Sequence, residues 1–82
     1  MNTKEIKVLL NTIDKVKLFA QEISKFEGDF CLISGRYVID AKSIMGIFSL
    51  DLSKALDLNC REIDDETFNN LVSVLKERKL LG

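Results

Sequence analysis

The stretch DAKSIMGIFSL, residues 40–50, combines a helix-start signal with more apolar residues than a short helix can bury. Ser43 can act as the N-cap, because its side-chain oxygen can accept a hydrogen bond from a backbone N–H that the first helical turn leaves unpaired. We therefore predict a short helix after Ser43, with part of its apolar surface facing a partner protein. The apolar residues in question are Ile44, Met45, Ile47, Phe48 and Leu50.

Before this stretch, the chain predicts a strand and then a helix. Apolar side chains recur at every second position over residues 5–10, which is the period of a strand with one buried face. Asn11 or Thr12 offers an N-cap, and Asp14 lies in the first turn, where the positive end of the helix dipole favours a carboxylate. Apolar residues then recur at helical spacing, so we predict a helix over residues 12–26.

A hairpin and a fourth strand complete the predicted sheet. Residues 30–33 and 37–40 are β-prone runs, and a short turn containing Gly35 separates them, which is typical of a hairpin. Apolar residues alternate with polar ones again over residues 56–61. We predict the fourth strand there.

The last segment predicts a helix whose charges need no ligand. Acids directly before an apolar helical stripe are more often capping and dipole residues than metal ligands, and cations suit the end of a helix. The acids are Asp64, Asp65 and Glu66, the stripe is Phe68, Leu71, Val72 and Leu75, and the cations are Lys76, Arg78 and Lys79.

The order of predicted elements is βαββαβα, and each helix has an apolar face that must be covered. One four-stranded antiparallel sheet, covered on one face by the three helices, satisfies all of them. We therefore predict an α+β sandwich that forms a single domain over residues 1–82.

Composition narrows the range of functions. The net charge of −1 gives no electrostatic reason to expect nucleic acid or an anionic membrane as a partner. We find no bilayer-spanning apolar run and no signal-peptide pattern, so a cytoplasmic location is the default expectation. The chain has no histidine, which removes imidazole acid–base chemistry and imidazole metal ligation. Cys31 and Cys60 lack CxxC spacing and are interpreted as free, packed thiols.

No combination of residues suggests an enzyme in its own right. A glycine-rich phosphate loop, a nucleophile–base pair and a metal-ligand cluster are all missing from the sequence. We expect no metal and no cofactor.

The central stretch resembles the regulatory-serine segment of HPr, the histidine-containing phosphocarrier of the bacterial sugar phosphotransferase system. The similarity is sharpest over residues 42–46, KSIMG, together with Ser49 and Leu50. Elsewhere it is weak, although the order of elements matches that of HPr proteins over essentially the whole chain. The resemblance implies the open-faced β-sandwich of that family.

The resemblance also implies roles for particular residues. In the family, the serine at the position of Ser43 is phosphorylated by a dedicated kinase, and the apolar residues after it dock onto partner proteins. The positions that match this docking surface are Ile44, Met45 and Phe48.

The resemblance fails at the phosphocarrier site. HPr proteins place a histidine at the start of the first helix, followed by Ala, Arg and Pro, whereas here Thr12 takes the histidine position, Asp14 the arginine and Lys15 the proline. A threonine phosphate ester is too stable to pass its phosphate on readily, and a carboxylate would repel the phosphate. Relay through this site is excluded on chemical grounds, and we interpret Thr12 as a helix N-cap. The link after the second predicted helix is also shorter than in the family and lacks its glycine.

Three functions are compatible with these residues. The first is regulation through phosphorylation of Ser43, as in the catabolite-repression paralogue Crh, a branch that lacks the histidine, keeps the serine and binds a transcription regulator. The family's regulator-binding surface uses the arginine that is Asp14 here. The second is an HPr-like interaction domain in which Ser43 is only a cap, and the third is a phosphocarrier with another nucleophile. The implied partners are a serine kinase or phosphorylase, a transcription regulator, or phosphotransferase-system components, and the oligomeric state stays open.

Overall fold

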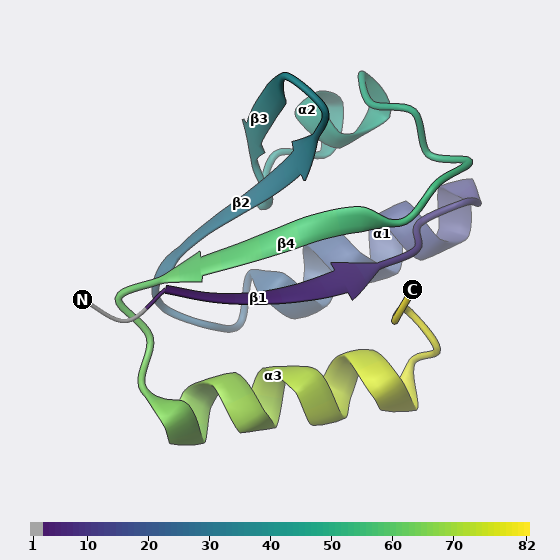
Figure 1. Cartoon of the computed structure of the whole chain (residues 1–82). Helices are drawn as coiled ribbons and strands as arrows, with labels where there is room; N and C mark the ends of the chain where they lie inside the picture. The colour runs from purple at the N-terminus through teal and green to yellow at the C-terminus, as the bar shows by residue number, and fades with distance from the viewer. Residues whose placement is uncertain (1–2) are drawn as a thin grey trace.

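Four strands form one antiparallel sheet in the computed structural model, which describes residues 3–82 (Figure 1). The strand order is β1-β4-β2-β3, so β1 and β3 are the edges. This arrangement confirms the predicted sheet. The strands are β1 (Thr3–Val8), β2 (Asp29–Ser34), β3 (Tyr37–Asp40) and β4 (Leu56–Arg61).

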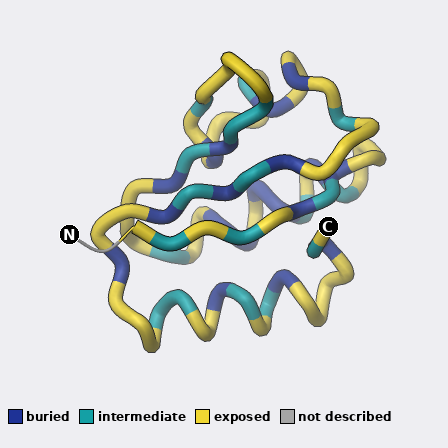
Figure 2. The backbone as a smooth tube through the Cα atoms, viewed as in Figure 1, coloured by how far each residue is buried: buried dark blue, intermediate teal, exposed yellow. Residues whose placement is uncertain are grey.

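Side-chain alternation gives the sheet one buried face and one open face. Ile6, Leu58, Leu32 and Ile39 stand opposite one another across the four strands, and they face the helices. The neighbouring row faces the other way and is half-buried or exposed (Figure 2). It consists of Glu5, Asn59, Cys31 and Asp40.

Three helices cover the buried face: α1 (Ile13–Ile23), α2 (Ile44–Phe48) and α3 (Asp65–Glu77). In Figure 1, α1 runs behind β4 and β1, α3 lies alongside β1, and α2 lies next to β3. The element order is βαββαβα, and the predicted α+β open-faced sandwich is confirmed.

All three helices begin with the side-chain caps that the sequence predicts. Thr12, Ser43 and Asp64 each have extended backbone geometry and accept a hydrogen bond from the backbone N–H three residues later. Hydrogen bonding from Thr67 lowers the pKa of the Asp64 carboxyl, which favours the charged, capping form. The acidic run at residues 64–66 is therefore the N-terminus of α3, as expected.

Two predicted elements differ from the structure by two or more residues at an end. The first strand lies at residues 3–8 rather than 5–10, although Leu10 is fully buried just beyond it. Helix α1 ends at Ile23 rather than at Phe26, because the Ser24 hydroxyl donates to the Ala20 carbonyl at 2.6 Å and the next residues form tighter three-residue turns. Phe26 still packs against the core from outside the helix.

One charged side chain is buried among residues 3–82, and the sequence pattern did not predict it. Glu22 on α1 is 4% exposed, and its Oε2 lies 3.3 Å from Lys25 Nζ and 3.6 Å from an Arg78 guanidinium nitrogen. The Arg78 contact joins the end of α3 to α1. Both cations are themselves about half exposed, so the contact is worth less than a fully buried ion pair.

Candidate functional site: the surface of helix α2

Helix α2 presents a serine and three apolar side chains on the surface of the protein. Ser43 is exposed, and its Oγ accepts a hydrogen bond from the backbone N–H of Gly46 at 3.2 Å. Met45 is 81% exposed, Phe48 is 41% exposed and Ile44 is 39% exposed, so part of the apolar surface of this helix does face outward. We call these four residues the α2 surface.

Two contacts on its inner side attach α2 to the rest of the protein. Ile47 is fully buried and belongs to the main core. Gly46 lies against β3, where a Cβ on this glycine would lie 3.4 Å from the Ile39 side chain and 3.3 Å from Ser43 Oγ. A five-residue helix can therefore bury only one apolar side chain fully, while the remaining ones stay at the surface.

The residues just before Ser43 make contacts that hold the start of α2 in position. Ala41 is buried, and its N–H donates to the Phe30 carbonyl at 2.9 Å. The Lys42 ammonium donates to the Phe26 carbonyl at 2.8 Å and lies 5.4 Å from the centre of the Phe30 ring. Asp40 accepts from the Lys42 N–H at 2.9 Å. Ser43 thus follows a turn that is held by several hydrogen bonds, and the Lys42 side chain beside it binds the segment that follows α1.

Thr12 and Asp14, which take the family's histidine and arginine positions, lie at the start of α1. The hydroxyl oxygen of Thr12 accepts from the Lys15 N–H at 3.1 Å, so it serves as a cap, as predicted. Both Thr12 and Asp14 are exposed. Helices α1 and α2 contact each other, which brings these two predicted regions to the same side of the sheet.

Exposed apolar residues outside α2 were missed in the sequence. Ile13, next to Thr12, is 63% exposed. Tyr37 and Val38 on β3 are also mostly exposed, and β3 borders α2. Isoleucine, tyrosine and valine occur both buried and exposed, so the residue types alone do not predict exposure. Their exposure follows from their positions, at the start of a helix and on the edge strand of the sheet.

Both cysteines are free, in agreement with the prediction. Cys60 faces the core of the sheet, and burial raises the pKa of its thiol to about 11. Cys31 faces the open side, where desolvation and the neighbouring Asp29 carboxylate raise its pKa. Both shifts favour the protonated thiol, which is the unreactive form.

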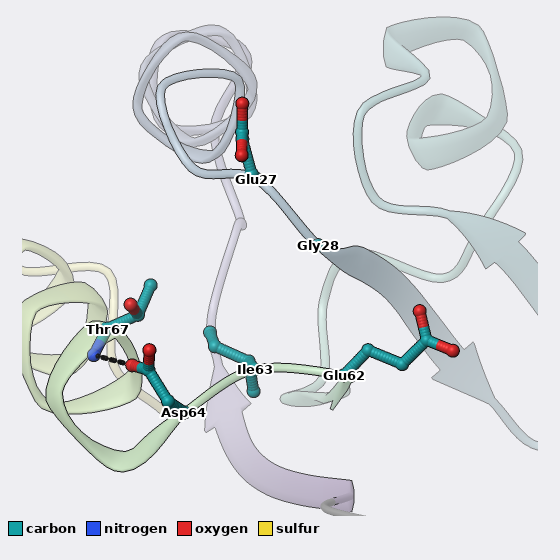
Figure 3. Close-up of a pocket in the computed structure, with 6 residues that line it drawn as sticks. All are labelled: Glu27, Gly28, Glu62, Ile63, Asp64 and Thr67. Carbon is teal, nitrogen blue, oxygen red and sulfur yellow. Dashed lines mark hydrogen bonds between the residues drawn. The ribbon is translucent and has the colours of Figure 1, made fainter.

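A pocket of about 390 Å³ lies beyond the other end of α1, between the loops that precede β2 and α3 (Figure 3). Glu27, Glu62 and Asp64 line it, but Figure 3 shows their carboxylates pointing in different directions, and Asp64 is occupied by the Thr67 N–H. In the described part of the chain, no group of three or more His, Cys, Asp or Glu residues could hold a metal ion.

Within residues 3–82, none of the helices has the length and apolar character needed to cross a bilayer.

Comparison with known proteins identifies the fold and the family. No family model and no curated protein matches the sequence. Among solved structures, the chain is similar to HPr-C-His from Thermoanaerobacter tengcongensis, with 31% identity over 93% of this chain and 92% of that one and a TM-score of 0.69. It is also similar to the phosphocarrier protein HPr from Bacillus anthracis, with 26% identity over 88% and 93% of the two chains and a TM-score of 0.64.

A more distant likeness supports the fold alone. The histidine-containing phosphocarrier protein of Mycoplasma aligns over 98% of both chains with a TM-score of 0.70, at 15% identity. The fold is thus shared along nearly the whole chain, and the first of the three relatives exceeds 30% identity. Together with the element order and the DAKSIMG segment, these similarities show that the chain belongs to the HPr family.

Proposed function

We propose that this HPr-family chain is a regulatory protein related to the phosphoenolpyruvate-dependent sugar phosphotransferase system, controlled by phosphorylation of Ser43 and acting through protein binding at the α2 surface. The observation that supports it is the juxtaposition of an exposed serine with three exposed apolar side chains on one short helix. Exposing Met45 and Phe48 to water does not stabilise the fold, whereas a contiguous exposed apolar patch is typical of a protein interaction site.

Phosphorylation of Ser43 would change the charge of this surface strongly. The Ser43 hydroxyl would attack the terminal phosphorus of ATP, lose its proton to a base of the kinase and release ADP. The product carries nearly two negative charges at pH 7 next to apolar side chains that can pack against a partner. A partner with an arginine beside an apolar pocket could then distinguish the two forms.

The proposal does not include phosphate relay. The chain has no histidine, and Thr12 already uses its hydroxyl oxygen to cap α1. The exposed carboxylate of Asp14 lies two residues further along, where it would repel a phosphate on Thr12. Proteins implied as partners are a serine kinase or phosphorylase, a transcription regulator and components of the phosphotransferase system.

The test is the intact mass of the protein after incubation with ATP and an HPr serine kinase. We expect one phosphate on the parent chain and none on Ser43→Asn. Asparagine is the better substitution than alanine because it retains the helix cap while removing the hydroxyl group. Ser49→Ala is a matched control from the other end of the same helix, where the Ser49 hydroxyl donates to the Gly46 carbonyl, and it should still take up one phosphate.

Two other results would contradict the proposal. No phosphate on any variant would leave the α2 surface as an interaction site without phosphorylation. Labelling of the chain from phosphoenolpyruvate by the first enzyme of the phosphotransferase system would instead indicate a carrier with a nucleophile other than histidine. A Thr12→Ala variant would show whether that nucleophile is Thr12.

A further inference from the structure

Strand β3 is an open edge of the sheet with apolar side chains on both of its faces. Among residues 3–82 it pairs only with β2, and Tyr37 is 69% exposed while Val38 is 59% exposed. The strand contains no lysine and no proline, which are the residues that usually protect an edge from pairing with another chain.

The opposite edge is protected. On β1, Lys4 forms an ion pair with Asp65 and Lys7 with Asp57. The end of the chain also covers part of this edge, because Leu81 forms a β-bridge with Val8 and the Gly82 N–H donates to the Lys7 carbonyl at 3.0 Å. Within residues 3–82, the end of the chain thus covers part of the β1 edge, whereas no further strand pairs with the outer edge of β3.

The hairpin geometry shows which backbone groups of β3 are free. Ser34 stands opposite Tyr37 across a two-residue turn, so this pair is hydrogen-bonded, and alternate residues along an antiparallel strand point the same way. The Ala41 N–H donates to the β2 residue Phe30, in keeping with that alternation. The odd-numbered residues therefore point toward β2. Val38 and Asp40 have backbone groups that point outward. The Asp40 carbonyl already accepts from the Ser43 N–H at 3.0 Å, so the free groups in this part of the described chain are the Val38 N–H, the Val38 carbonyl and the Asp40 N–H.

We propose that β3 pairs antiparallel with β3 of a second copy of this chain, about a two-fold axis at Val38. Outward-pointing residues must meet each other for the ladder to form, so the even-numbered residues pair with even-numbered residues. Placing Val38 opposite Val38 of the second copy pairs apolar with apolar on the open face. The same register places Arg36 of each chain opposite Asp40 of the other.

The charges of Arg36 and Asp40 favour this register over the two registers that are shifted by one hydrogen-bonding step. Shifting the strands by one hydrogen-bonding step in one direction would place Val38 opposite Asp40, and shifting in the other direction would place it opposite Arg36. Within residues 3–82, neither Arg36 nor Asp40 belongs to an ion pair, so both charges are available across the interface. Opposite charges directly across a strand pair are stabilising and like charges are destabilising.

The pairing would create a continuous eight-stranded sheet with a functional consequence. A two-fold axis perpendicular to the sheet keeps the helices of both copies on the same side. Because α2 borders β3, the two α2 surfaces would then lie near each other, arranged to meet a two-fold symmetric partner. A four-residue strand buries less area than a standard interface, so we expect a dissociation constant of roughly 10 µM or weaker.

Sedimentation equilibrium from about 10 µM to about 1 mM protein tests the dimer. We expect a monomer–dimer equilibrium that Val38→Lys abolishes, since a lysine at the centre of the edge would meet a lysine of the second copy. Val38→Thr keeps a β-branched side chain and should still dimerise. Glu5→Lys, on the open face of β1, is the control for an added lysine at the other edge and should leave the dimer intact.

A charge swap tests the register. Arg36→Asp and Asp40→Arg should each weaken self-association by about tenfold or more, because each places two pairs of like charges opposite one another. Mixing the two variants should restore association, since the mixed dimer again pairs opposite charges. Asp40 also accepts from the Lys42 N–H, so circular dichroism must show that Asp40→Arg is folded, and Asp40→Asn provides a milder variant that keeps an acceptor.

Two outcomes would overturn the inference. A chain that is monomeric at every concentration has no such interface. A dimer that survives Val38→Lys, or a mixture of the charge variants that stays as weak as each alone, would place the interface elsewhere.

Discussion

Ser43 Oγ accepts a hydrogen bond from the Gly46 N–H at 3.2 Å, so the proposed phosphorylation site is also the N-cap of α2. The first prediction concerns this double role. Ser43→Ala should lower the free energy of unfolding by about 1 kcal/mol, because an N–H of the first turn loses its partner. Ser43→Asn should change it by less than about 0.5 kcal/mol, because asparagine caps equally well. Urea unfolding of the three proteins measures both values, and equal stability of all three would show that the cap contributes nothing.

The second prediction separates binding from folding within α2. Met45→Lys should leave the free energy of unfolding within about 0.5 kcal/mol of the parent, because Met45 is 81% exposed. Ile47→Ala should cost about 2 to 4 kcal/mol, because Ile47 is fully buried and leaves a cavity. Urea unfolding gives the stabilities, and Met45→Lys should at the same time lose binding to any partner of the α2 surface. A large loss of stability in Met45→Lys would mean that this side chain packs against the fold.

The third prediction is a loss of stability at high pH caused by Cys60. Burial raises the pKa of its thiol from the ordinary 9.0 to about 11, so the unfolded chain loses this proton first. The protonated Cys60 thiol therefore contributes to the free energy of unfolding on the order of 2 kcal/mol, relative to high pH. This contribution is fully present below pH 9 and is lost as the pH rises from 9 to about 11. Urea unfolding at several pH values in that window should show a shallower decline for Cys60→Ala than for the parent. Cys31→Ala should retain the Cys60 component, and equal declines in the parent and in Cys60→Ala would refute this assignment.

The fourth prediction concerns the end of α3, where Lys79 adopts a φ of 61°. The Leu80 N–H donates to the Leu75 carbonyl and the Lys79 N–H to the Lys76 carbonyl, which is the pattern of a Schellman cap. Lys79→Gly should raise the free energy of unfolding by roughly 0.5 to 1 kcal/mol, because glycine adopts a positive φ without strain. Lys76→Gly, one turn earlier inside the helix, should instead lower it by about 1 kcal/mol. A destabilised Lys79→Gly in a thermal or urea titration would contradict this account of the cap.

The starts of the helices could be predicted from the sequence because they depend on neighbours within one turn. Thr12, Ser43 and Asp64 each cap the helix that the sequence placed after them. The exposure of Ile44, Met45 and Phe48 was also predictable, because a helix of five residues has too little buried surface for its apolar content. Alternation of apolar residues likewise identified β1 and β4, and two β-prone runs around a glycine-containing turn identified β2 and β3.

Other features depend on residues far apart in the chain. The burial of Glu22 required the end of α3 to bring Arg78 beside α1, which no local pattern encodes. The exposure of Tyr37 and Val38 followed from the strand order, because β3 lies at the edge of the sheet and β1 has its own edge covered by the end of the chain. Only the tertiary structure could decide these points.

The sequence by itself determined the element types, their caps, the α+β class and the absence of a histidine for phosphate relay. The tertiary structure decided which charged group is buried, which strand edge is open and how α1 and α2 come together on one side of the sheet. The physical reason is the range of the interactions involved. Capping and alternation act within a few residues, whereas burial and exposure depend on which distant segment covers a side chain.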